Sequence, residues 1–230
     1  MTRVLAIGDV HAPATHPGYR AWCLYLAEKW NTTRVVFIGD IIDSHQISYH
    51  PAEPDAPGAG DEADQTLEHV QAWCSSFPRA VVTIGNHDER AFRLAASVNI
   101  PGRFIRDYAK LWKTPRWKWV REVEIDGVNY IHGTGLGGQQ PALSAARLSM
   151  QSTVCGHVHS TAGVRWVAGK ERIFGMDTGC GCDPDHVAMA YGRNLVRRPI
   201  LGAGVVIDGT PYHEIMPIER GSKFHRSRFK

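Results

Sequence analysis

The sequence predicts an α/β fold, and three short apolar runs separated by helical patterns carry this prediction. The runs cover residues 4–7, 35–38 and 81–84. Each run is followed by glycine and then by a polar residue, which is Asp9, Asp40 or Asn86. Each has the length and β-branched content of a strand and is apolar on both faces, as is typical of a buried parallel strand. Alternation of such strands with helices indicates an α/β domain.

Amphipathic patterns fill both intervals between these runs. The first consists of Trp22, Tyr25, Leu26 and Trp30, and the second of Leu67, Val70 and Cys74. Both repeat with the period of a helix that buries one face. Residues 51–61 are rich in Pro, Gly, Ala and acidic residues, so we expect a surface loop there.

The C-terminal half is expected to be more antiparallel. Further strands are predicted at residues 123–125, 128–132, 153–156, 173–177 and 204–207. Asp126-Gly127 and Asp208-Gly209 are hairpin turn signals. No segment is long enough to be a linker, so residues 1–218 are predicted to form one domain, followed by a basic, flexible tail at 219–230.

Composition and charge favour a soluble, cytoplasmic protein. Hydrophobic residues make up 43% and charged residues 21%, and no run of about 18 apolar residues could span a membrane. Asp9 interrupts the N-terminal apolar run where a signal peptide would continue. The net charge is +3, but residues 220–230 contribute five basic residues and no acid, so the rest carries −2. An acidic body would suit cations.

The five cysteines are odd in number and scattered, which favours a reducing compartment over a disulfide framework. They are Cys23, Cys74, Cys155, Cys180 and Cys182. Cys180-Gly-Cys182 could belong to a thiolate metal site, but no second pair completes four ligands. Packing of small cysteines in a loop is the preferred interpretation.

Polar side chains with metal-binding chemistry follow the strand-like runs. The ligand site of an α/β sheet lies beyond the carboxyl ends of its strands, so we expect these side chains to gather at one edge. Carboxylates and imidazoles together suit divalent ions such as manganese, iron or zinc. The expected ligands are Asp9, His11, Asp40, Asn86, His132, His157 and His159. Seven ligands are too many for one tetrahedral ion and fit two ions that share a bridging carboxylate.

In this order the motifs resemble those of the calcineurin-like metallophosphoesterases. The signature D-x-H, G-D-x-x-D, G-N-H-[DE], H, G-H-x-H is matched at residues 9–11, 39–43, 85–88, 132 and 156–159. The resemblance extends over residues 4 to about 208, and no ligand position is missing. It implies a four-layer α/β/β/α sandwich of two packed mixed sheets, with the metal ions at one edge.

The resemblance also distributes the ligands between two ions. One ion would be held by Asp9, His11, Asp40 and His159. The other would be held by Asp40, Asn86, His132 and His157, with Asp40 as the bridge. We expect manganese, with iron, zinc, nickel or cobalt as alternatives.

Such a centre predicts hydrolysis of a phosphate ester. Two adjacent ions can clamp the attacking and leaving oxygens, and a water bridging them would lose a proton and attack as hydroxide. His87 is placed to protonate the leaving oxygen or to stabilise charge on the phosphoryl group. Asp43 would orient His87, although a helix N-cap is an alternative role for Asp43. Asp88 and Arg90 are considered for supporting roles or for a helix start.

Departures from the family pattern bear on the substrate. Members that are protein phosphatases resemble G-D-x-x-D-R-G and R-G-N-H-E, in which two arginines grip a dianionic monoester. Here Ser44 and Ile84 stand at the arginine positions, and Ala12 replaces the glycine expected after D-x-H. A diester carries one negative charge and can bind without that clamp. We therefore expect a phosphodiesterase for nucleotides or nucleic acid, with a phosphomonoesterase or a non-catalytic metal-binding scaffold as alternatives. The oligomeric state is left open.

Residues 110–121 interleave three tryptophans, Trp112, Trp117 and Trp119, with five basic residues. Aromatic side chains among cations could stack on the bases of a single strand. The preferred alternative is an amphipathic edge on which Trp117 and Trp119 face the core.

Overall fold

Two mixed β-sheets form the centre of the computed structural model, which describes residues 1–48, 56–186 and 198–217. The first sheet has the strand order β11-β10-β1-β2-β3-β4. Its strands are β1 (Arg3–Ile7), β2 (Arg34–Phe37), β3 (Ala80–Thr83), β4 (Trp117–Val120), β10 (Gly202–Ile207) and β11 (Thr210–Ile215). Strands β1 to β4 are parallel, and β10 and β11 add antiparallel strands beside β1.

The second sheet has the order β5-β6-β7-β9-β8. Its strands are β5 (Glu122–Ile125), β6 (Val128–Ile131), β7 (Ser152–Cys155), β8 (Ala162–Ala168) and β9 (Arg172–Thr178). Strands β6, β7 and β9 are parallel, whereas β5 and β8 pair antiparallel at the two edges.

Alternating side chains of the parallel strands fill two separate cores. On β1, Val4 and Ala6 face the second sheet and pack with Phe174 and Met176. Leu5 and its neighbours on the other face pack against the helices α1 (Tyr19–Lys29) and α2 (Ala59–Ser76). Burial on both faces explains why these strands are apolar without alternation.

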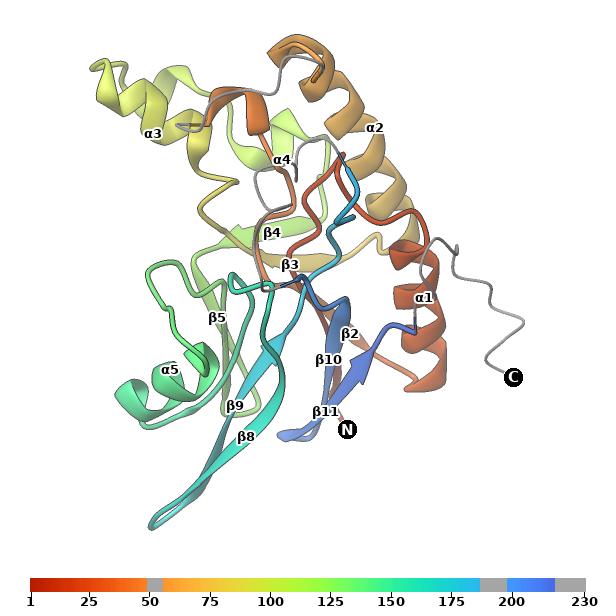
Figure 1. Ribbon diagram of the computed structural model, residues 1–230, viewed down its shortest axis with the longest axis vertical. Helices are drawn as coiled ribbons and strands as arrows, with labels where there is room; N and C mark the ends of the chain where they lie inside the picture. Colours follow the sequence, from red (N-terminus) through yellow and green to blue (C-terminus); the bar gives the residue numbers. More distant parts are fainter. Residues whose placement is uncertain (49–55, 187–197, 218–230) are drawn as a thin grey trace.

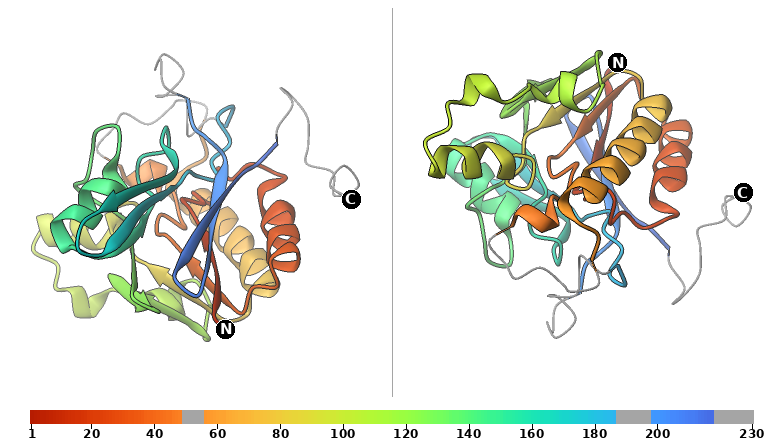
Figure 2. Two further views of the ribbon diagram at one scale, coloured as in Figure 1. Left: turned by 90° about the horizontal axis from the view of Figure 1, so that it is seen from below. Right: turned by 90° about the horizontal axis from the view of Figure 1, so that it is seen from above.

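Helices cover the outer face of each sheet, so the four layers predicted by the resemblance are confirmed (Figure 1). Helices α1 and α2 run side by side over the first sheet (Figure 2). Helix α5 (Pro141–Ser149) packs on β7 and β9 of the second. Its close approach requires Gly175, because a Cβ there would overlap the backbone of Ala142.

Both predicted hairpin turns are confirmed. Asp126 and Gly127 join β5 to β6 with φ values of 52° and 74°. Asp208 and Gly209 join β10 to β11 with φ values of 45° and 78°. Two consecutive left-handed residues are typical of a type I′ turn, which suits the twist of a hairpin.

The prediction of a loop throughout residues 51–61 is wrong at its C-terminal end, because α2 begins at Ala59. Asp61 and Glu62 lie in the first turn of this helix, where acidic groups are stabilised by the helix dipole. Residues 51–55 lie outside the described residues, as do the basic tail and the predicted domain boundary at 218/219.

Three short helical segments separate β3 from β4. They are α3 (Arg90–Ser97), the 3₁₀ helix η2 (Gly102–Phe104) and α4 (Tyr108–Leu111). A further 3₁₀ helix, η1 (His45–Ile47), follows β2. Among the helices of the described residues, none has the length and apolar content needed to cross a membrane.

Candidate metal centre

The seven predicted ligands lie beyond the carboxyl ends of β1, β2, β3, β6 and β7, where the two sheets meet. Direct contacts link them. The Nε2 atom of His132 lies 3.2 Å from Asp40 Oδ2 and 3.1 Å from Asn86 Oδ1. His11 Nε2 lies 3.1 Å from His159 Nε2. These distances place side chains from five loops in one cluster.

Two more contacts join the remaining predicted ligands to the cluster. The backbone N–H of His157 donates to Asp9 Oδ2 at 2.9 Å. The rings of His132 and His157 lie edge to face with centroids 5.0 Å apart. The structure therefore brings together all seven residues that the sequence singled out.

Buried acceptors on the far side of two imidazoles set their orientation. His132 Nδ1 lies 2.8 Å from the carbonyl oxygen of Ile38. His11 Nδ1 lies 2.8 Å from Asp43 Oδ1. Both contacts require a proton on Nδ1, so Nε2 is the atom of each ring that could bind an ion. Metal-binding histidines are commonly held in this way.

Left-handed backbone occurs at four of the seven predicted ligands. The φ angles are 25° at Asp9, 49° at His11, 44° at Asp40 and 67° at His157. This conformation is costly for residues other than glycine and concentrates at functional sites. The two carboxylates also depend on bare backbone, because a Cβ at Gly85 would overlap the Asp40 carboxylate and one at Gly156 would overlap that of Asp9.

The cluster has the electrostatics of a cation site. Asp9 and Asp40 are fully buried, and burial raises the pKa of Asp9 to about 8. Burial lowers the pKa of His11, His157 and His159, which favours the neutral imidazole that binds metals. Burial opposes protonation of His132, but Asp40 and Asp9 raise its pKa to about 10, so this ring carries the positive charge that a divalent ion would otherwise supply to the buried carboxylates.

Three overlapping groups of side chains have ligand atoms close enough to hold an ion. They are Asp40–His132–His157, His11–Asp40–His87 and His11–His159–Cys182. The first contains three members of one predicted ligand set. The other two add His87 and Cys182, which were not expected among the ligands. Cys182 Sγ lies 3.8 Å from His159 Nδ1, so this thiol packs behind the ring rather than at its Nε2 atom.

His87 stands at the rim of the cluster and contacts Asp43. Its Nδ1 atom lies 3.0 Å from Asp43 Oδ1, the same oxygen that contacts His11. Although burial opposes protonation, Asp40 and Asp43 together raise the pKa of His87. One carboxylate oxygen thus orients a predicted ligand and the predicted acid at the same time.

Arg90, for which only a supporting role or a helix start was expected, contacts both Asp43 and His87. Its Nη1 atom donates to the carbonyl oxygens of Asp43 and Ser44 at 2.6 and 3.1 Å. Its Nη2 atom lies 3.0 Å from His87 Nε2. A guanidinium therefore faces the proposed proton-donating atom, although neither of the two family arginine positions carries arginine. The three-residue spacing between His87 and Arg90 does not by itself indicate this contact, because the position of the guanidinium depends on the path of the 43–44 loop.

The sequence profile of the calcineurin-like phosphoesterases matches residues 2–171. The chain belongs to this family. Several solved structures are similar to this chain at low identity. The Vps29 structure from Cryptosporidium parvum is 14% identical, with 94% of this chain and 96% of that chain covered and a TM-score of 0.45. A nuclease, MPE, from Pseudomonas putida is 15% identical over 92% and 87% of the two chains, with a TM-score of 0.44.

A third solved structure is that of Yfce, a phosphoesterase from E. coli. It is 17% identical, with 90% of this chain and 88% of that chain covered and a TM-score of 0.41. A search among curated proteins found no match.

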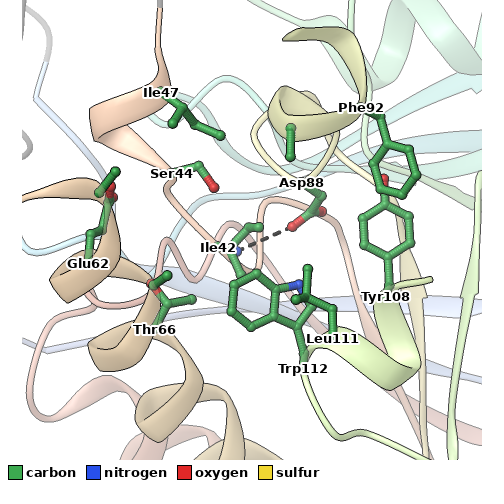
Figure 3. A pocket seen from close by; sticks show the side chains of 13 residues that line it. Ile42, Ser44, Ile47, Glu62, Thr66, Asp88, Phe92, Tyr108, Leu111 and Trp112 are labelled. Atoms are coloured by element: carbon green, nitrogen blue, oxygen red, sulfur yellow. Dashed lines mark hydrogen bonds between the residues drawn. The ribbon is translucent and has the colours of Figure 1, made fainter. Parts of the chain in front are cut away.

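An apolar pocket of about 180 Å³ adjoins the phosphoesterase centre, between α2, α3 and α4 (Figure 3). The side of the pocket nearest the centre is lined by Ile42 and Ser44, which flank Asp43, and by Asp88, which follows His87. Asp88 accepts hydrogen bonds from the backbone N–H groups of Ile42 and Gly85, so it ties the two loops together. Burial raises the pKa of Asp88 to about 7.

Aromatic residues form the far wall of this pocket. Phe92, Tyr108 and Trp112 line it, and the indole N–H of Trp112 has no partner among the described residues. Trp117 is also buried, and Trp119 stacks on Tyr108 at a centroid distance of 4.8 Å. The tryptophans of residues 110–121 therefore belong to the core and its edge, which confirms the amphipathic interpretation and rules them out as exposed stacking platforms.

Proposed function

We propose that this phosphoesterase is a hydrolase with two divalent metal ions and that it prefers phosphodiesters, with nucleotides or nucleic acid as substrates. The observation that carries the proposal is the cluster of the buried Asp9 and Asp40 carboxylates with several imidazole side chains. Asp9, His11, Asp40 and His159 would hold one ion, and Asp40, Asn86, His132 and His157 the other. Manganese is the expected metal, with iron, zinc, nickel or cobalt as alternatives.

When bound, such ions supply positive charge to the phosphoryl oxygens and lower the pKa of a coordinated water. The protein's own residues prepare the centre for them. Asp43 and the Ile38 carbonyl hold His11 and His132 with Nε2 directed inward. Backbone N–H groups of His87 and His157 hold the Asp40 and Asp9 carboxylates. The ligands are thus fixed before the ions bind, which reduces the entropy lost on binding.

His87 is proposed to donate a proton to the leaving oxygen, and Arg90 to bind a phosphoryl oxygen beside it. The raised pKa of His87 favours a proton on Nε2, yet Nη2 of Arg90 points at the same atom. An anionic oxygen that lies beside both atoms would accept hydrogen bonds from the guanidinium and from the protonated ring. We therefore expect one phosphoryl oxygen to bind beside His87 and Arg90.

A single guanidinium matches a diester better than a monoester. Arg90 already donates two hydrogen bonds to backbone carbonyls. It therefore has fewer donors left for a phosphate group than the two arginines expected of the protein phosphatases. The apolar pocket beside Ile42 and Ser44 provides surface for the second substituent that a diester carries. Arg90 also supports the alternative, a phosphomonoesterase, because one arginine can still bind a dianion.

The non-catalytic scaffold is the less favoured alternative, since the ligand set and the Asp43–His87 pair are both present. A cytoplasmic location is also proposed, supported by the five cysteines, none of which forms a disulfide.

The deciding experiment compares bis-(4-nitrophenyl) phosphate with 4-nitrophenyl phosphate at matched pH and manganese concentration. We expect the higher kcat/KM for the diester. This ratio reports binding of the transition state, and the single guanidinium and the apolar pocket should bind that of the diester better. A preference of about tenfold or more for the monoester, equivalent to about 1.4 kcal/mol, would favour the phosphatase. Absence of turnover with either ester and each metal would favour the scaffold.

A further inference from the structure

Residues 90–121, which follow β3 and include β4, carry a large share of the positive charge of the chain. They contain nine lysines and arginines and a single acid, Asp107, so their net charge is +8. The whole chain carries +3, so all other residues together carry −5. We call this segment, with α3, η2 and α4, the basic lobe.

The charge of the basic lobe is available at the surface. Eight of its nine basic residues are exposed, and Arg90 at the metal centre is the exception. Lys110 pairs with Asp107, and Arg121 pairs with Glu89. The remaining six form no ion pair within the part of the chain that the structure describes; they are Arg93, Arg103, Arg106, Lys113, Arg116 and Lys118.

Apolar side chains of the same lobe are also exposed. Phe104 is 74% exposed and Val98 61%, and Ile100 lies between them at 46%. Helix α3 is amphipathic but has no fully buried residue. Arg103 lies over the Phe104 ring at 5.8 Å, and Arg106 follows two residues later. An aromatic ring between cations is thus presented to solvent, at a position that the tryptophan pattern did not indicate.

The basic lobe adjoins the metal centre directly. Helix α3 begins at Arg90, three residues after His87, and Arg90 contacts the His87 ring. Helix α3 projects from the carboxyl end of β3, while the β8–β9 hairpin extends from the opposite end of the molecule (Figure 1). A polymer bound along the lobe would therefore lead to the centre.

We infer that the basic lobe is a binding surface for single-stranded nucleic acid, which it guides into the metal centre. This inference rests on the proposed diesterase function and identifies its substrate class. Exposed cations neutralise phosphates, and an exposed ring flanked by cations stacks on an unpaired base. A second copy of the chain fits poorly, because two lobes of charge +8 repel each other. A duplex would use the cations but would leave Phe104 without a stacking partner.

Binding is tested with a fluorescein-labelled oligodeoxynucleotide of about 20 nucleotides, a length that covers one to several site sizes. The protein is loaded with manganese and carries His87→Asn, which prevents turnover while the fluorescence anisotropy of the oligonucleotide is measured. Three variants are compared with this parent. One is Arg93→Glu with Arg103→Glu and Arg106→Glu, the second is Phe104→Ala, and the control is Arg165→Glu with Lys170→Glu and Arg172→Glu. The control reverses three exposed cations beside Trp166 on the distant hairpin.

We expect the triple reversal in the lobe to weaken binding by at least about tenfold and to flatten the slope of log K against log salt by about 2, since each phosphate contact on a single strand contributes about 0.7. Phe104→Ala should weaken binding by about 5- to 100-fold, the range for loss of one stacked base. The hairpin control should change it by less than about threefold. With His87 intact, the same three sets of substitutions should leave kcat/KM for bis-(4-nitrophenyl) phosphate within about threefold of wild type, because none of the substituted residues touches the metal centre.

Several outcomes would overturn the inference. Equal losses in the lobe and hairpin variants would show non-specific attraction. Tighter binding of duplex, of acidic phospholipid vesicles or of a second copy, measured by light scattering, would assign the surface to that occupant. Failure of the proposed function is distinguishable: wild-type protein would then hydrolyse no diester, whereas specific binding by the lobe would persist.

Discussion

Asp43→Asn tests whether one carboxylate oxygen supports both halves of the site. Asp43 is buried, and its Oδ1 atom contacts His11 at 2.8 Å and His87 at 3.0 Å. Asparagine keeps the size and one acceptor oxygen but removes the charge. Metal affinity and the rate of hydrolysis should therefore fall together, because His11 is a proposed ligand and His87 the proposed acid.

The magnitude follows from the type of hydrogen bond. A hydrogen bond to a charged group contributes about 1.5–3 kcal/mol and a neutral one about 1 kcal/mol. The hydrogen bond to each imidazole should therefore become weaker by about 1 kcal/mol or somewhat more. Substitution of groups that orient metal ligands commonly costs about 10- to 100-fold in affinity or activity. We expect a loss in that range for manganese affinity and a comparable loss for kcat at saturating metal.

Manganese affinity is measured by competition with a fluorescent chelator, and kcat with bis-(4-nitrophenyl) phosphate. Asp88→Asn is the matched control, because Asp88 is equally buried but, among the described residues, its carboxylate accepts hydrogen bonds only from the backbone N–H groups of Gly85 and Ile42. It should change metal affinity by less than about threefold. Wild-type affinity in Asp43→Asn would refute the reasoning, since His11 would then not depend on this carboxylate.

Three further predictions concern the acid, the guanidinium and stability. His87→Asn should lower kcat by about 10²- to 10⁴-fold with two ions retained on elemental analysis; loss of metal would make His87 a ligand. Arg90→Gln should lower kcat/KM by at least about tenfold and Arg90→Lys by less, if the positive charge beside His87 binds a phosphoryl oxygen; equal rates for all three proteins would exclude that role. Asp177→Asn should raise the free energy of unfolding by about 1–2 kcal/mol at pH 7 but not at pH 4, as measured by urea titration. Burial raises the pKa of Asp177 to about 6. The protonated Asp177 therefore contributes stability below its unfolded pKa, and this contribution is lost as the pH rises through 6. An effect of Asp177→Asn that does not change with pH would contradict this.

The fold was predictable where residues are buried on both faces. Strands β1, β2 and β3 are unbroken apolar runs, and the two Asp-Gly turns fix their hairpins through left-handed backbone. Strand β8 was not predicted, because it lies at a sheet edge and half exposes residues such as Trp166. Helix α3 was missed for a related reason, since its apolar face is not buried by the rest of the chain.

The ligand cluster was predictable because each motif follows a strand, and the ends of adjacent strands meet. The contact between Arg90 and His87 was not, because a long side chain can take many paths and its path here is set by the carbonyls of residues 43 and 44. The positive φ angles at Asp9 and Asp40 were also unpredictable, since the surrounding structure imposes them against local preference. We propose base stacking for Phe104 and not for the tryptophans, because Trp112 and Trp117 are buried whereas Phe104 is exposed. The sequence alone does not show this difference in burial.

The count of metal ions per chain tests the central claim most directly. The protein is loaded with manganese, desalted and measured by elemental analysis against its amino-acid content. Seven side chains that include the shared Asp40 predict two ions per chain, and Asp40→Asn should lose both, whereas Asn86→Ala should lose mainly one. A single ion in fully loaded wild-type protein would contradict the two-ion centre.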